Sequence, residues 1–243
     1  IDEAQLILFV VDVTAGVVDL DTAVSRMLRK IDKPVLLVVN KVDNGQRLIE
    51  YPIKKLAALG VTDIVINHAY LGDKIVAALG DGSDYGVSIH YSKEPEPLET
   101  AGGISQALPL LGDEPFILIN GDVWCDMDLI SLLDVSLEGL AHLVLVENPE
   151  HNVKGDFSMQ PNGLLTALNT DGLAGYTYSG MALISPKLFQ QYNVHHGPLA
   201  PLLRQAMADE KVTAQLHRGL WFDVGTPQRL HELDSLLRHQ SIN

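Results

Sequence analysis

The chain alternates short, continuous runs of apolar residues with stretches that have helical spacing. The runs at 6–11, 35–39, 61–67 and 116–120 have the length of strands. Between the second and third of them, residues 48–59 carry apolar side chains three and four positions apart. Apolar runs without polar alternation are typical of strands that are covered on both faces. The sequence therefore predicts a doubly wound α/β domain, with a mostly parallel sheet and helices on both faces.

The same alternation continues to the end of the chain. Residues 148–171 interrupt it, because they are rich in Gly, Asn, Pro and Asp, which indicates hairpins and loops at one end of the sheet. Ligands of doubly wound sheets bind at the carboxyl ends of the strands. Further strands are expected at 87–91, 141–147, 176–184, 212–217 and 220–224, and further helices at 21–30, 71–79, 99–108, 129–133, 199–209 and 228–239.

Charge and cysteine content exclude several classes of protein. Lys and Arg number 17 against 31 Asp and Glu, a formal charge of −14, which makes the chain a poor binder of nucleic acid or of anionic membranes. Its one cysteine, Cys125, excludes an internal disulfide and a structural zinc cluster, and it has no basic neighbour that would mark it as reactive. No run of about 18 apolar residues and no signal peptide is visible, so a cytoplasmic location is expected.

Two aspartates follow predicted strands at positions far apart in the sequence. Asp122 comes after a buried strand and a glycine, and Asp223 ends a later strand. The two carboxylates can meet only through the fold. Magnesium sites are commonly built from one or two carboxylates plus substrate phosphates. Either aspartate alone could be a helix cap or a turn residue, but together they favour a Mg²⁺ site.

A second candidate segment precedes a predicted helix. Residues 98–103 are expected to form a strand-to-helix turn. Its small residues would let a base and a ribose lie against the backbone, with amides at the helix start as donors. A glycine-softened helix cap is the alternative. Asn67 ends a strand at the same sheet edge, where it would face either a nucleotide or a sugar, or satisfy loop backbone from a buried position.

From about residue 45 to its end, the chain resembles the sugar-1-phosphate nucleotidyltransferases. The matching segments occur in the family's order: GQRLIEYPIKKLAALGVTDIVINHAYLGDKI, PLETAGGISQALPLLGDEPFILINGDVW, GDF, YTYSG, LAPLLRQAM and GLWFDVGTPQRL. They cover roughly four-fifths of the sequence. The resemblance implies a Mg²⁺-dependent reaction in which UTP and N-acetylmuramate 1-phosphate give a UDP-sugar and pyrophosphate.

The resemblance also implies roles for individual residues. Those expected to hold the metal and carry catalysis are Asp122 and Asp223. Those expected to contact the nucleotide are Glu99, Thr100, Ala101, Gly102, Gly103, Asn120 and Gly121. Those expected near the sugar are Asn67, Gly155, Asp156, Tyr178, Ser179 and Gly180, for which ordinary turn and strand roles are the alternative.

Residues 1–44 depart from this family. They contain LILFVVD and KPVLLVVNKVDN and resemble the middle of a tandem-domain ribosome-assembly GTPase, in which Asn40, Lys41 and Asp43 would read guanine. A phosphate-binding G-x-x-x-x-G-K-[ST] loop is absent from the sequence, and so is the G-x-G-x-R loop that opens the nucleotidyltransferase family. We interpret the chain as a chimera of a fragment at 1–44 and a domain at 45–243, which share one sheet, and we expect impaired turnover. The alternatives are a non-catalytic scaffold and a guanine-nucleotide binder.

Overall fold

The computed structural model describes residues 36–39, 46–68, 72–94, 98–168, 172–192 and 196–240. The expected strand at 6–11, the expected helix at 21–30, the boundary near residue 44 and the guanine-reading residues Asn40, Lys41 and Asp43 lie outside these ranges. The strands are β1 (Leu36–Val39), β2 (Asp63–His68), β3 (Ser88–Lys93), β4 (Phe116–Asn120), β5 (Val123–Cys125), β6 (Ala141–Val146), β7 (Phe157–Met159), β8 (Leu165–Ala167), β9 (Gly175–Ile184), β10 (Val212–His217) and β11 (Trp221–Asp223). The helices are α2 (Gln46–Ala58), α3 (Gly72–Leu79), α4 (Glu99–Leu111), α5 (Ile130–Leu133), α6 (Lys187–Tyr192), α7 (Leu199–Ala208) and α8 (Pro227–Gln240), with 3₁₀ turns η1 (Ser83–Tyr85) and η2 (Glu150–Asn152).

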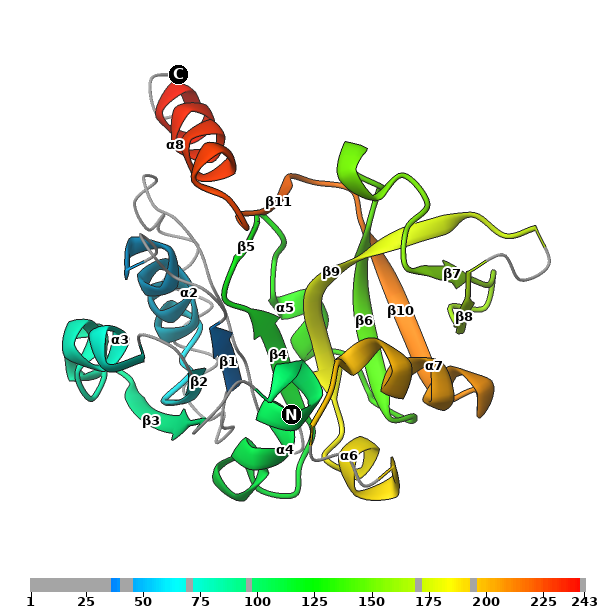
Figure 1. Cartoon of the computed structure of the whole chain (residues 1–243), viewed down its shortest axis with the longest axis horizontal. Helices are drawn as coiled ribbons and strands as arrows, with labels where there is room; N and C mark the ends of the chain where they lie inside the picture. The colour runs from blue at the N-terminus through cyan, green and yellow to red at the C-terminus, as the bar shows by residue number, and fades with distance from the viewer. Residues whose placement is uncertain are drawn as a thin grey trace.

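The main sheet has the strand order β10-β6-β9-β4-β1-β2-β3 (Figure 1). Neighbouring strands run parallel except at β9, which is antiparallel to both β4 and β6. The hairpin of β7 and β8 joins the sheet beside β9, and β5 and β11 form a separate two-stranded sheet. The predicted doubly wound, mostly parallel sheet is confirmed.

The direction of winding reverses between β1 and β4. From β1 the chain moves outward through α2 to β2 and through α3 to β3, then returns through α4 to β4 on the other side of β1. Right-handed crossovers in opposite directions place α2 and α3 on one face of the sheet and α4 on the other. The reversal makes a switch point at the carboxyl ends of β1 and β4, where doubly wound folds bind their ligands.

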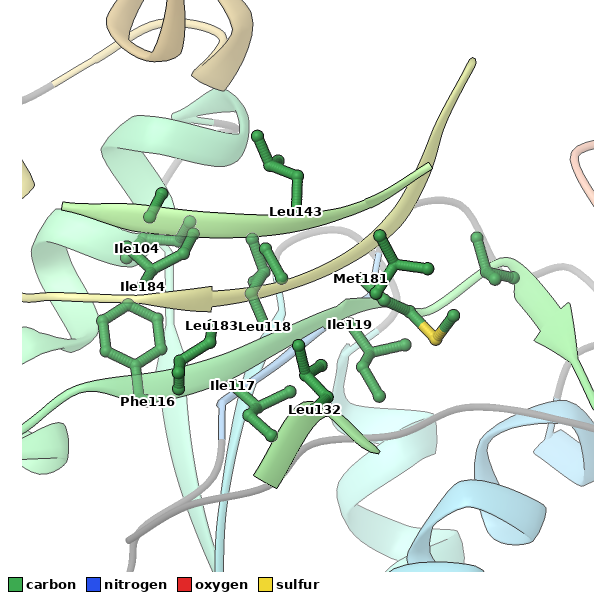
Figure 2. Close-up of a cluster of buried hydrophobic side chains, with 14 of the residues drawn as sticks. Ile104, Phe116, Ile117, Leu118, Ile119, Leu132, Leu143, Met181, Leu183 and Ile184 are labelled. Atoms are coloured by element: carbon green, nitrogen blue, oxygen red, sulfur yellow. The ribbon is translucent and has the colours of Figure 1, made fainter. Parts of the chain in front are cut away.

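The central strand β4 is buried on both faces. Phe116, Ile117, Leu118 and Ile119 are at most 1% exposed. Figure 2 shows that Ile117 and Ile119 point to the side of Leu132 from α5, while Phe116 and Leu118 point to the opposite side. This two-sided burial explains why the sequence of β4 is a continuous apolar run.

Two short elements were not predicted from the sequence. The strand β5 has three residues, and its pairing partner β11 lies almost a hundred residues further along the chain, so no local periodicity announces it. The helix α6 has six residues, KLFQQY, too few to display a helical repeat. None of the described helices is long and apolar enough to cross a membrane.

Buried His142 predicts a pH dependence of stability. Its ring nitrogens lie 2.8 Å from Thr213 Oγ1 and 3.3 Å from Gln215 Oε1, between β6 and β10. Burial lowers the pKa of His142 from its ordinary value of 6.5. The folded state therefore disfavours the charged imidazole. The contribution of His142 to stability is complete above the pKa that the histidine has in the unfolded chain, and it decreases as the pH falls below that pKa.

We expect the unfolding free energy to decrease between about pH 7.5 and pH 5.5 by at most ~1.4 kcal/mol per pH unit from this group. Denaturant unfolding at both pH values would show a smaller decrease in His142→Gln than in the wild type. The control His90→Gln changes an exposed histidine and should keep the wild-type pH dependence. An unaltered pH dependence in His142→Gln would contradict the prediction.

Candidate active site

The short sheet of β5 and β11 brings the two predicted aspartates together. Asp223 lies opposite Val123 in the antiparallel ladder, and the Val224 N–H donates to the carbonyl of Asp122. Burial raises the pKa of the Asp122 carboxyl, and the negative charge of Asp223 raises it further. The two carboxyl groups are thus within electrostatic reach of each other. Figure 1 shows β5 just beyond the carboxyl end of β4.

Asp223 is held by partners from three segments. Its Oδ1 accepts hydrogen bonds from the Arg229 guanidinium of α8 and, at 3.3 Å, from the Gly225 N–H. Its Oδ2 lies 3.0 Å from Nε2 of His151 in η2. Neither Arg229 nor His151 was predicted from the sequence to have a role. Arg229 lies in the family-like segment GLWFDVGTPQRL, six positions after Asp223, and this proximity could have indicated a role. The sequence around His151 contains no comparable indication.

The carboxylate pair fits a hard divalent cation. In the part of the chain that the structure describes, Asp122 makes no ion pair, so its partly buried charge lies beside a second carboxylate without a compensating cation. A carboxylate has about four acceptor sites, of which the partners of Asp223 occupy three, and one site on Oδ2 is left. Oxygen ligands of this kind suit Mg²⁺ and similar ions.

A second group of polar residues joins β2 to the start of α4. Glu94 accepts a 2.7 Å hydrogen bond from the Asn67 side-chain amide on one oxygen and a 2.7 Å bond from the Leu98 N–H on the other. Asn67 is 1% exposed, and its Oδ1 has no hydrogen-bond partner among the residues that the structure describes. Glu94 opens the proline-rich stretch at 94–97, for which no role was predicted from the sequence.

The small residues at the start of α4 serve close packing. A Cβ on Gly103 would lie 2.2 Å from Asn67 Nδ2 and 2.5 Å from Glu94 Oε1, so the amide–carboxylate pair needs a glycine here. The N–H groups of Ala101 and Gly102 donate to the Gly197 carbonyl at 2.9 and 3.4 Å. These two amides are therefore engaged with the loop before α7.

The entry to α4 is more open. Glu99 is exposed and Thr100 is partly exposed. Glu99 has a φ of 61°, a left-handed conformation that costs a non-glycine residue of order 1–3 kcal/mol. Since such strained residues cluster at ligand-binding positions, Glu99 and Thr100 are the part of the segment best placed to meet a nucleotide.

At the other side of β4, Gly180 lets β9 approach the aspartate loop. Gly180 has a φ of 84°, and a Cβ there would lie 2.9 Å from Val123 and 3.0 Å from the Asn120 side-chain amide. The Ser179 carbonyl accepts a 2.9 Å hydrogen bond from the Trp221 indole N–H. Asn120, the buried Gly121, Ser179 and Gly180 thus surround the loop that carries Asp122.

Gly155, Asp156 and Tyr178 lie together where β9 begins. Asp156 accepts a 3.1 Å hydrogen bond from the Asn152 side-chain amide on one oxygen and a 2.8 Å bond from the Tyr178 N–H on the other. Gly155 has a φ of 74°, and a Cβ there would collide with Asn148 and Tyr176. The Tyr178 hydroxyl is buried and finds no hydrogen-bond partner in the described part of the chain, and burial raises its pKa. Asp156 therefore holds the start of β9 in place, while the buried hydroxyl of Tyr178 remains available as a hydrogen-bonding group.

These groups share one end of the sheet. The nucleotide candidates lie at β2 and α4, the aspartates at β5 and β11, and the sugar candidates at β7 and β9. A pocket of about 410 Å³, lined in part by Glu114, Glu138, Lys187 and Lys211, lies at the opposite end, where β4, β6 and β10 begin. Since doubly wound folds bind ligands at the carboxyl ends of their strands, the site belongs at the end with the aspartates.

The chain is similar to known proteins in sequence and in fold. The nucleotidyl transferase family model matches residues 27–155, and the chain belongs to this family. The chain is 47% identical over 210 residues to an N-acetylmuramate alpha-1-phosphate uridylyltransferase from Neisseria meningitidis serogroup B, a match that covers 84% of the chain and 88% of that protein. The family match, this relative and the fold make the chain a sugar-1-phosphate nucleotidyltransferase.

Two other proteins resemble the chain, one in sequence and one in fold. A mannose-1-phosphate guanyltransferase from Aspergillus fumigatus is 29% identical over 221 residues, covering 81% of this chain and 58% of its own length. The structure of HddC from Yersinia pseudotuberculosis, complexed with GMP-PN, superposes with a TM-score of 0.65 at 18% identity and covers 82% of this chain and 97% of that one. None of these matches supports the GTPase resemblance of residues 1–44, and the family match begins inside that segment.

Proposed function

We propose that the chain transfers a uridylyl group from UTP to N-acetylmuramate 1-phosphate, with Mg²⁺ held by Asp122 and Asp223. The observation that supports the proposal is the β5–β11 ladder, which puts Asp223 opposite Val123, the neighbour of Asp122, so that the charge of Asp223 acts on the Asp122 carboxyl near the switch point of the sheet. The name of the Neisseria relative supports the choice of nucleotide and sugar.

The reaction needs no nucleophile from the protein. A phosphate oxygen of the sugar phosphate attacks the α-phosphorus of UTP, and the bond to the β-phosphate breaks to release pyrophosphate. A divalent ion at the aspartates would neutralise phosphate charge and align the two substrates. Arg229 and His151 orient Asp223, which leaves a site on its Oδ2 open toward the ion.

The nucleotide is placed by the group around α4. Because Glu94 takes the Asn67 amide N–H, the Asn67 side chain is fixed with its Oδ1 as a buried acceptor. An imide N–H, as in uracil, is a suitable donor for such an acceptor. Glu99, Thr100 and the following small residues would lie against base and ribose. On the other side of β4, Ser179, Gly180 and the Tyr178 hydroxyl would lie near the sugar.

The printed sequence has no G-x-G-x-R loop, so we propose that this chain binds uridine nucleotide but turns over slowly. Each missing charge-assisted phosphate contact is worth about 1.5–3 kcal/mol. Loss of three such contacts would slow the reaction at least ~1,000-fold compared with a relative that has the loop. The fusion of a GTPase fragment at 1–44 remains a prediction from the sequence.

Pyrophosphate release with UTP, Mg²⁺ and N-acetylmuramate 1-phosphate tests the activity, and calorimetry with UDP and GDP tests the base. We expect slow release that is abolished in Asp122→Ala, and tighter binding of UDP than of GDP. A preference for GDP that disappears in Asp43→Asn would establish the guanine-binding alternative. Release as fast as that of a relative that has the loop would show that the loop is not needed, and failure to bind UDP would overturn the proposal.

Gly103→Ala tests the nucleotide side separately. A methyl group there would push apart the Asn67 amide and the Glu94 carboxylate, although alanine in a helix interior is intrinsically more stable than glycine by about 1 kcal/mol. We expect UDP binding to weaken at least ~10-fold, the equivalent of one lost hydrogen bond of ~1.4 kcal/mol. Calorimetry measures this, and Ser105→Ala, in the same helix, should bind UDP as the wild type does. Unaltered binding in Gly103→Ala would contradict the placement of the nucleotide.

A further inference from the structure

Three metal-binding side chains of different chemistry meet at the ends of β5 and β10. Cys125 is the last residue of β5, Asp126 follows it, and His217 is the last residue of β10. The cysteine sulfur, a carboxylate oxygen of Asp126 and a ring nitrogen of His217 lie within 4.8 Å of one another. Asp126 Oδ1 and His217 Nε2 are 2.7 Å apart. Cys125 is buried, while His217 is partly exposed and Asp126 is exposed, so the group opens to solvent on one side.

Gly219, in the loop between β10 and β11, leaves space beside Asp126 and His217. A Cβ on Gly219 would lie 2.2 Å from Asp126 Oδ1 and 2.6 Å from His217 Nε2. The Asp126 N–H also donates to the Leu220 carbonyl at 3.1 Å, which holds the loop in place. The space next to the Asp126 and His217 ligand atoms therefore depends on the glycine.

This group differs from the other histidine–aspartate pairs among the described residues. His90 and Asp63 are 3.4 Å apart on the surface, and His151 and Asp223 are 3.0 Å apart beside the carboxylate pair. Of the three pairs, the one at His217 is the shortest and the one that forms a three-ligand group with a cysteine. An exposed ion pair by itself would not require a buried sulfur at its side.

We propose that Cys125, Asp126 and His217 form a second metal site, which takes a thiophilic divalent ion of the Zn²⁺ type with solvent as the fourth ligand. Sulfur, imidazole and carboxylate form a ligand set suited to Zn²⁺, at about 2.3 Å for sulfur and 2.0–2.2 Å for nitrogen and oxygen. Mg²⁺ prefers oxygen ligands, so the aspartate pair and this group select different ions. A lone cysteine excludes a cysteine-rich zinc cluster, but not a mixed site of this kind.

Burial raises the pKa of the Cys125 thiol to about 12. The metal-free thiol is therefore protonated, and an incoming ion must displace its proton.

The site would brace the catalytic loop. Cys125 pairs with Trp221 in the ladder that also carries Asp223, and Asp122 lies at the other end of β5. In Figure 1 the chain leaves β10 and enters β11 beside β5. An ion bound to His217 and Cys125 would fasten the end of β10 to this ladder. It should therefore raise the stability of the fold without replacing Mg²⁺ at the aspartates.

Cobalt titration of the metal-free 243-residue chain tests the site, because a cysteine ligand gives a sulfur-to-cobalt charge-transfer band in the near ultraviolet. We expect the band to saturate at one equivalent of Co²⁺ and to vanish when Zn²⁺ is added. It should be absent in Cys125→Ser. In His217→Asn the affinity should fall more than ~100-fold, since loss of an outer-sphere partner alone costs ~10–100-fold. Zn²⁺ should raise the melting temperature of the wild type and leave that of His217→Asn unchanged.

Two variants serve as controls. His90→Asn alters a histidine–aspartate pair outside this group, and Asp122→Asn alters the predicted magnesium site; both should keep the band. Absence of the band in the wild type would overturn the proposal, and so would a full-strength band in His217→Asn. Loss of the band in Asp122→Asn would assign the cobalt to the aspartate pair and would likewise overturn it. Should Cys125→Ser fail to fold, the titration of His217→Asn decides.

Discussion

Replacing Asp122 by Asn should abolish most of the catalytic activity while making the folded protein more stable. The substitution removes one of two carboxylates proposed to hold Mg²⁺, and a metal's stabilisation of transition-state charge is worth several kcal/mol. A loss of ~3 kcal/mol corresponds to a rate at least ~100-fold lower. The neutral amide also ends the repulsion from Asp223 and the cost of burying a charge, so we expect the unfolding free energy to rise by about 1 kcal/mol at neutral pH.

The gain in stability should depend on pH in a defined direction. The pKa of Asp122 is raised above its ordinary value of 3.8 in the folded state, so the wild type is stabilised by a bound proton at low pH and loses this stability as the pH rises through the raised pKa. The difference between Asp122→Asn and the wild type should therefore be small at low pH and reach a plateau at neutral pH. Denaturant unfolding at several pH values measures it.

Asp134→Asn is the matched control. Asp134 is exposed and lies just after α5, so this substitution should alter neither the activity nor the pH dependence. An Asp122→Asn protein that releases pyrophosphate at the wild-type rate would contradict the metal-binding role. One that is less stable than the wild type at neutral pH would show that its carboxylate is compensated in a way that the geometry does not reveal.

The parts of the fold that the sequence predicted are those with strong local patterns. The strand β4 was predicted with its observed bounds, because its apolar run is buried on both faces and ends at Asn120 and Gly121. The two aspartates were expected to meet because Asp122 follows one predicted strand, Asp223 ends another, and both lie in segments that resemble the family. In these places the local sequence pattern agrees with the position in the tertiary structure, and strand pairing brings the two segments together.

The partners of these residues could not be predicted in the same way. His151 reaches Asp223 across 72 positions of sequence, and Glu94 reaches Asn67 across 27. Such hydrogen bonds leave no periodic trace, since each depends on where loops cross rather than on which face of an element a residue occupies. The same is true of Gly103. That a side chain would not fit at this position becomes clear only when its neighbours in space are known.

Replacing Arg229 by Gln should lower turnover about 10- to 100-fold without weakening the binding of Mg²⁺. Arg229 holds both Oδ1 and the main-chain carbonyl of Asp223, and its removal leaves His151 and the Gly225 N–H to orient that carboxylate. A misplaced ligand costs rate, because alignment of the reacting groups supplies much of the catalysis. Loss of a nearby positive charge, in contrast, favours a cation. We also expect a loss of about 1–3 kcal/mol in unfolding free energy.

Single-turnover kinetics at saturating Mg²⁺, together with a Mg²⁺ titration, separates the two effects. Arg218→Gln is the matched control, because Arg218 pairs with Glu147 on the surface, where both side chains are more than half exposed and the pair is worth at most ~1 kcal/mol. Arg229→Lys keeps the charge but loses the planar guanidinium, so it should restore stability more than rate. If Arg229→Gln instead weakened Mg²⁺ binding at an unchanged saturated rate, Arg229 would act in assembling the metal site rather than in aligning Asp223 for the transfer.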